Sequence, residues 1–70
     1  MAILIYLNGK KEEIVQDSSI LQLLESKKIR PEVVTVELNG KIIEKEQYSK
    51  ILLKPNDKLE FIYYMGGGIS

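Results

Sequence analysis

Two Asn-Gly dipeptides, each placed directly after a strand-like run, most constrain how this chain of 70 residues can fold. Both positions of an Asn-Gly pair readily take a positive φ, so the pair favours the two-residue turn of a β-hairpin. Asn8-Gly9 joins the apolar residues 3–7 to residues 11–15, whose more polar composition is typical of an edge strand. The sequence therefore predicts that the chain begins with a hairpin.

The second Asn-Gly pair, Asn39-Gly40, follows residues 33–38, which are a strand by composition. Residues 41–43 after the turn predict a short return strand. Residues 44–48 are interpreted as a loop or a single helical turn. A second hairpin is therefore expected in the middle of the chain.

One helix is expected between the two hairpins. Ser19, with Gln22 three positions later, fits a capping box, although Ser18 or Asp17 could cap the helix instead. The pattern predicts a helix that runs to about Lys28, with Pro31 as its stop. Its apolar side is expected to carry four residues: Ile20, Leu21, Leu23 and Leu24.

The last third of the chain predicts a brief strand at 51–53, a turn at 54–57 and a final strand at 59–64. Since one helix can cover only one face of a sheet, the fold class is α+β, with two layers. The final strand is apolar on both sides, so it is expected beside the first strand in the centre of the sheet. This is a β-grasp, or ubiquitin-like, domain with a mixed sheet of four to five strands, expected over residues 1–65.

Composition excludes several functions. The chain has no cysteine and no histidine, which removes disulfides, thiolate nucleophiles, Ser-His-Asp arrangements and nearly all zinc chemistry. Ten basic and ten acidic side chains cancel, which argues against a nucleic-acid binder. No apolar run is long enough to span a membrane and no signal peptide is recognisable, so we expect a cytoplasmic monomer.

No catalytic residues are expected. Glu12 and Glu13 are neighbours on a strand and would point to opposite faces, so they cannot act as a catalytic pair. Asp57 is expected to close a turn, and Glu60 to stand on the outer face of the last strand. We therefore predict that the chain is not an enzyme and binds neither a metal nor a cofactor.

The glycine triplet Gly66, Gly67 and Gly68 follows the final strand almost at once. Glycine lacks a Cβ, so such a segment can enter a channel that is too narrow for side chains. One interpretation is a frayed tail without function. The interpretation we favour is that residues 66–70 form a flexible tail whose end is the substrate of another enzyme.

The final strand also predicts a docking surface. If Leu59 and Phe61 face the core, Ile62 and Tyr64 form an exposed apolar patch on the other side. Single exposed apolar residues are also routine in monomeric proteins. We predict a partner-docking surface made of four residues: Glu60, Ile62, Tyr64 and Met65.

Over essentially its whole length the chain resembles the ThiS-type sulfur carriers of the ThiS/MoaD ubiquitin-like family. The related small subunits of molybdopterin synthase share the fold and the Gly-Gly end, but the compact length looks closer to ThiS. The resemblance is carried by Asn8-Gly9, Leu23-Leu24, residues 36–40, 54–57 and 59–62, and the terminal glycines.

The resemblance implies a role in making the thiazole half of thiamine. A ThiF-like adenylyltransferase would use ATP to adenylate the terminal glycine, and sulfur would replace the adenylate to give a thiocarboxylate. Thiazole synthase would accept that sulfur. Gly67 and Gly68 correspond to the reactive diglycine of the family, and Gly66 to an extra glycine that some members carry.

The chain departs from the family at its end, where Ile69 and Ser70 follow the last glycine. We favour trimming by a protease. The other interpretations are that the activating enzyme tolerates the two residues, that they are an artificial addition, or that the protein is a non-conjugating interaction module. A carrier for molybdopterin or another sulfur-containing product would differ only in its partners.

Overall fold

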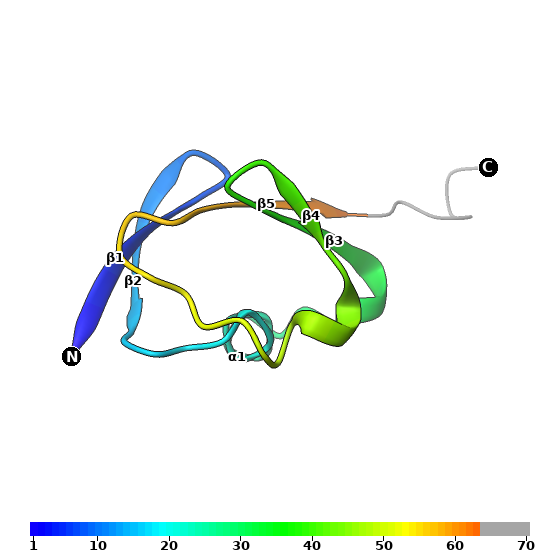
Figure 1. Cartoon of the computed structure of the whole chain (residues 1–70), viewed down its shortest axis with the longest axis horizontal. Coiled ribbons are helices and arrows are strands. Elements are labelled where there is room, and N and C mark those ends of the chain that lie inside the picture. The colour runs from blue at the N-terminus through cyan, green and yellow to red at the C-terminus, as the bar shows by residue number, and fades with distance from the viewer. Residues whose placement is uncertain (64–70) are drawn as a thin grey trace.

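The fold is a five-stranded mixed sheet with one α-helix on one face, as the computed structural model shows (Figure 1). The structure describes residues 1–63. Along the sheet the strand order is β2-β1-β5-β3-β4, so β5 lies in the centre beside β1, as predicted. The pair β1–β5 is parallel and the other neighbouring pairs are antiparallel. The predicted β-grasp class is confirmed.

The five strands are β1 (Ala2–Leu7), β2 (Lys10–Val15), β3 (Val34–Leu38), β4 (Lys41–Ile43) and β5 (Lys58–Tyr63). The helix α1 (Ile20–Ser26) connects the first hairpin to the rest of the sheet. Two short 3-10 turns, η1 (Pro31–Val33) and η2 (Lys45–Gln47), flank the second hairpin. The single helical turn foreseen at 44–48 is therefore present. None of the helices within residues 1–63 is long and apolar enough to cross a membrane.

Both hairpin turns form as the sequence predicts. Asn8 and Gly9 have φ values of 50° and 84°, and Asn39 and Gly40 have φ values of 52° and 88°. Two consecutive positive φ values define the turn whose twist matches that of the flanking strands. The register of β2 on β1, from Leu7–Lys10 to Ala2–Val15, follows from the first turn.

The capping box at the start of α1 is confirmed. The Ser19 hydroxyl accepts from the Gln22 backbone N–H at 3.0 Å, and the Gln22 side chain accepts from the Ser19 N–H at 2.8 Å. These two bonds satisfy backbone donors that have no partner within the helix. The sequence thus identified the first residue of the helix correctly.

The predicted helix end was wrong. The helix ends at Ser26, and Lys28 takes a left-handed φ of 60°. Its N–H donates to the Glu25 carbonyl at 3.0 Å, and the Ile29 N–H donates to the Leu24 carbonyl at 2.9 Å. This pair of bonds is a Schellman motif, which closes a helix without a proline. Pro31 instead begins the turn η1.

The predicted strand at 51–53 was also wrong. Leu52 makes an isolated bridge with Ser19, outside the sheet. The Leu53 N–H donates to the Ser18 carbonyl at 2.8 Å, and the Ile20 N–H donates to the Ile51 carbonyl at 3.2 Å. The three apolar residues therefore pair with the start of the helix, where Leu53 is buried.

The core lies between α1 and the covered face of the sheet. The apolar side predicted for the helix is confirmed, with Leu21 partly buried and its other three members fully buried. Tyr48, which follows η2, is also buried; the sequence predicted a loop or a single helical turn there and gave no indication of burial. The buried apolar residues are Ile5, Ile20, Leu23, Leu24, Val34, Val36, Tyr48, Leu53, Leu59 and Phe61.

Candidate functional site

The candidate site is the outer face of the sheet around the end of β5. Figure 1 shows α1 on one side of the sheet, while no helix formed by residues 1–63 covers the opposite side. Leu59 and Phe61 point to the core and are 1% and 5% exposed, whereas Ile62 is 44% exposed. The predicted division of β5 into a buried and an exposed side is confirmed for these residues.

Neighbouring strands extend this outer face beyond β5. Glu60 lies directly opposite Glu37 of β3, and Glu37 lies opposite Ile42 of β4. Because directly paired residues point to the same side of a sheet, these three side chains form a row across the outer face. Ile62 lies opposite Thr35 in the next row. The sequence did not predict that Ile42 belongs to this face, although it is 65% exposed. The strand β4 has only three residues and two adjacent isoleucines, so alternation does not show which isoleucine points outward.

The two rows together combine exposed apolar side chains with acidic groups. Ile42 and Ile62 supply apolar area, and Glu37 and Glu60 are like charges in directly paired positions. Like charges placed opposite each other destabilise a sheet slightly, so this arrangement contributes nothing to the fold by itself. Apolar groups beside acidic groups suit the surface of a partner with basic and apolar groups.

Part of the predicted site lies outside the described residues. This applies to Tyr64 and Met65 of the docking surface and to Gly66, Gly67 and Gly68 of the tail, and with them to the predicted domain boundary at residue 65. Of the predicted docking residues, the structure places Glu60 and Ile62. Both are exposed on β5, close in sequence to the glycines.

Tyr6 and Tyr63 are only partly covered. Tyr6 lies opposite Lys58 on the outer face and is partly buried. Tyr63 shares its side of β5 with Phe61 but is 47% exposed at the end of the strand. Neither tyrosine belongs to the buried core.

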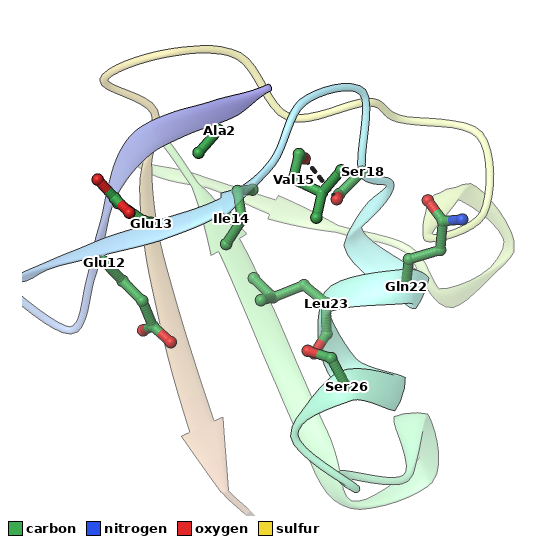
Figure 2. A pocket seen from close by; sticks show the side chains of 9 residues that line it. All are labelled: Ala2, Glu12, Glu13, Ile14, Val15, Ser18, Gln22, Leu23 and Ser26. Atoms are coloured by element: carbon green, nitrogen blue, oxygen red, sulfur yellow. Dashed lines mark hydrogen bonds between the residues drawn. The ribbon is translucent and has the colours of Figure 1, made fainter.

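The acidic residues take the structural roles that were expected. Figure 2 shows Glu12 and Glu13 on opposite sides of β2, and Glu12 forms an ion pair with Lys27 at the end of α1. The Asp57 carboxylate accepts from the Lys54 N–H at 2.8 Å and so closes the turn before β5. Among residues 1–63, no three histidine, cysteine or acidic side chains are grouped so that they could hold a metal ion.

A hollow lies between the edge strand β2 and the helix (Figure 2). Ile14 of β2 and Leu23 of α1 point toward each other across it, and the Ser18 hydroxyl donates to the Val15 carbonyl at 2.6 Å. These contacts belong to the packing of the helix against the sheet. Nothing in this hollow resembles a catalytic arrangement.

The fold and this outer face define a small β-grasp domain whose central strand leads toward a glycine-rich end. The ThiS family model matches residues 3–68. This chain therefore belongs to the ThiS family. The match extends through the three glycines and leaves Ile69 and Ser70 outside it.

Two curated relatives agree with this assignment. The chain is 36% identical over 66 residues to the sulfur carrier protein ThiS of Bacillus subtilis (strain 168), covering 93% of this chain and all of that protein. It is also 30% identical over 64 residues to a thiazole synthase of Magnetococcus marinus. The second match covers 91% of this chain but 20% of that protein.

Solved structures show the same fold. The crystal structure of the thiamine biosynthesis protein ThiS from Geobacter metallireducens superposes with a TM-score of 0.81 at 36% identity. The match covers 94% of this chain and 100% of the chain in that crystal structure. The solution structure of a thiamine biosynthesis protein from the same organism gives a TM-score of 0.79, with 94% and 88% covered.

Proposed function

We propose that this protein is a sulfur carrier whose C-terminal glycine delivers sulfur for the thiazole half of thiamine. The observation that carries the proposal is the ThiS family match over residues 3–68, which includes all three glycines. The 36% identity to a sulfur carrier over that protein's whole length supports it. The protein acts as a substrate in this proposal, and its folded body supplies no catalytic group.

The chemistry takes place at the terminal carboxylate of Gly68. A carboxylate oxygen attacks the α-phosphorus of ATP, pyrophosphate leaves, and an acyl adenylate forms. Hydrosulfide, or an equivalent sulfur donor, then attacks the carbonyl carbon and AMP departs, which leaves a thiocarboxylate. The adenylating enzyme must bring the reacting atoms to within about 3–3.5 Å of each other, which a segment without side chains permits in a narrow channel.

The partners are a ThiF-like adenylyltransferase, which uses the ATP, and a thiazole synthase, which accepts the sulfur. The match to part of a thiazole synthase supports the second partner, because that protein contains a region similar to this chain. The third partner is a protease that removes Ile69 and Ser70, because the carboxylate that is adenylated must lie on a glycine. Since these steps use ATP and cytosolic enzymes, we place the protein in the cytoplasm.

We propose that the partners dock on the outer face around Glu60, Ile62, Tyr64 and Met65. Glu60 and Ile62 are exposed there, and Ile42 of β4 enlarges the apolar part. A surface next to the reacting tail lets one partner hold the body while its active site receives the glycines. Binding energy gained at the body then helps to position the reacting carboxylate.

The test is intact-mass analysis after incubation with ATP, a ThiF-like enzyme and hydrosulfide. Both the full-length chain and a chain ending at Gly68 are used, so that trimming and activation are separated. Exchange of one oxygen for sulfur in the chain ending at Gly68 is the expected result. If both chains remain unmodified, the protein is not a carrier for that enzyme.

Deletion of residues 66–70 separates the carrier from an interaction module that uses the same face. A carrier loses all sulfur transfer but keeps binding to its partner, because the docking surface remains on the body. Full biological activity of the deleted chain would refute the proposal.

A further inference from the structure

Two asparagine side chains bond to the main chain of β5, one at its first residue and one in its second half. The Asn39 side-chain oxygen accepts from the Lys58 N–H at 3.0 Å, where the strand begins. The Asn8 side-chain oxygen accepts from the Phe61 N–H at 2.8 Å, and the Asn8 N–H donates to the Leu59 carbonyl at 2.9 Å. Asn8 and Asn39 occupy the same position of matching turns, with φ values of 50° and 52°.

Asn8 and Asn39 differ in how close to the C-terminal glycines they bond along β5. β1 pairs with β5 through Tyr6–Lys58 and Leu7–Leu59, and β1 then ends. The Asn8 side chain supplies the next bond on this edge, at Phe61. On the other edge, β3 pairs with β5 as far as Tyr63. Asn8 thus extends the β1 side of the sheet by a side-chain bond where the main-chain ladder stops.

We propose that Asn8 is a positioning residue for the C-terminal glycine. By holding the Phe61 amide, Asn8 keeps the last residues of β5 in the sheet and fixes the point from which the tail reaches the adenylating enzyme. This inference rests on the proposed function, since it assigns a role only if the tail is the substrate. A frayed strand end enlarges the volume that the terminal carboxylate searches, which lowers the fraction of molecules in reacting geometry.

The role requires a side-chain oxygen on a residue that tolerates positive φ. Aspartate meets both requirements, since it carries the same oxygen and accepts the left-handed conformation. Glycine accepts the conformation but has no oxygen. Asn8→Asp is therefore the conservative variant and Asn8→Gly the disruptive one. Asn39→Gly is the matched control. It places a glycine at the same position of an equivalent turn, so the extra loss of backbone entropy on folding is the same.

Amide hydrogen exchange measures the local effect in the full chain. Asn8→Gly is expected to speed exchange at Phe61 by about fivefold or more, because one hydrogen bond of ordinary strength is lost. Asn8→Asp should leave that rate within about twofold of the original protein. Asn39→Gly should speed exchange at Lys58 and leave Phe61 unchanged. Equal rates at Phe61 in the original protein and in Asn8→Gly would overturn the inference.

Adenylation kinetics, followed by pyrophosphate release, measure the functional effect in the chain form that the enzyme accepts. Asn8→Gly is expected to lower kcat about fivefold or more with KM changed less than about twofold, because docking is kept and positioning is lost. Asn8→Asp should restore kcat, and Asn39→Gly should leave it unchanged.

Equal losses in Asn8→Gly and Asn39→Gly would assign Asn8 a purely structural role and overturn the inference while leaving the carrier function intact. Failure of the original protein to be adenylated would instead overturn the carrier function, and this inference with it. The two failures are therefore distinguishable.

Discussion

Replacement of Leu24 by alanine tests whether the body of the protein is held together by the packing of α1 against the sheet. The Leu24 side chain is 0% exposed and lies in the core with residues of the helix and the sheet. The change removes three carbon groups, each worth about 0.8 kcal/mol when buried, so transfer alone predicts a loss of about 2.4 kcal/mol. The cavity left behind raises the expected loss to about 3–4 kcal/mol.

This loss is large for so small a domain. At about 0.05–0.15 kcal/mol per residue, the free energy of unfolding of a chain of 70 residues is about 3.5–10.5 kcal/mol. Leu24→Ala is therefore expected to remove about a third or more of the stability of the domain. Urea denaturation followed by circular dichroism measures the free energy of unfolding, with the slope against urea as a check on two-state behaviour.

Leu52→Ala is the matched control. Leu52 is 46% exposed in the segment that bridges Ser19, so its replacement should cost less than about 1 kcal/mol. Similar losses in Leu24→Ala and Leu52→Ala would refute the view that burial under the helix dominates stability. A loss below about 1 kcal/mol in Leu24→Ala would refute it directly.

Three further substitutions separate the cap, the docking surface and the tail. Ser19→Ala removes the capping-box acceptor and should lower the free energy of unfolding by about 1 kcal/mol. Ser19→Asn should keep most of the stability that the cap provides. Equal stability of Ser19→Ala and the original protein in urea denaturation would contradict this. Ile62→Arg should raise the KM of adenylation or sulfur transfer about tenfold, with stability changed by less than about 0.5 kcal/mol. Val15→Arg, at a 69% exposed site on the edge strand β2, is its control, and equal KM values in the two variants would exclude the docking surface. Gly67→Val should abolish adenylation in the pyrophosphate assay and leave urea denaturation unchanged, since we propose a channel that admits glycine; normal turnover would refute that proposal.

The sequence predicted best those features that depend on a few adjacent residues. The two Asn-Gly turns and the Ser19–Gln22 capping box each follow from local backbone chemistry, and the structure confirms all of them. The alternation along β5 separated the buried Leu59 from the exposed Ile62, because successive side chains of a strand point to opposite faces.

The features that the sequence did not predict depend on contacts between distant segments. Lysine carries no local preference for a positive φ, so nothing at Lys28 indicated the left-handed residue that closes the helix after Ser26. Three apolar residues at 51–53 fit a short strand as well as a buried loop, and only their bonds to the start of the helix decide between these. Tyr48 is flanked by two polar residues on each side, at 46–47 and 49–50, so its immediate neighbours did not indicate burial.

The part of the site on β5 was predictable and its extension across the sheet was not. Glu60 and Ile62 follow from alternation within one strand, whereas Glu37 and Ile42 join them only through the pairing of β3 with β5 and β4. The bond from Asn8 to Phe61 connects residues 53 positions apart, which no local pattern indicates.

Fragmentation mass spectrometry of the chain ending at Gly68, after reaction with ATP, a ThiF-like enzyme and hydrosulfide, tests the central proposal most directly. We predict that the exchanged sulfur is found in the fragment that contains the terminal carboxyl of Gly68, and in no fragment from the folded body. Sulfur located elsewhere in the chain, or no exchange in a reaction that modifies an established carrier, would contradict the proposal.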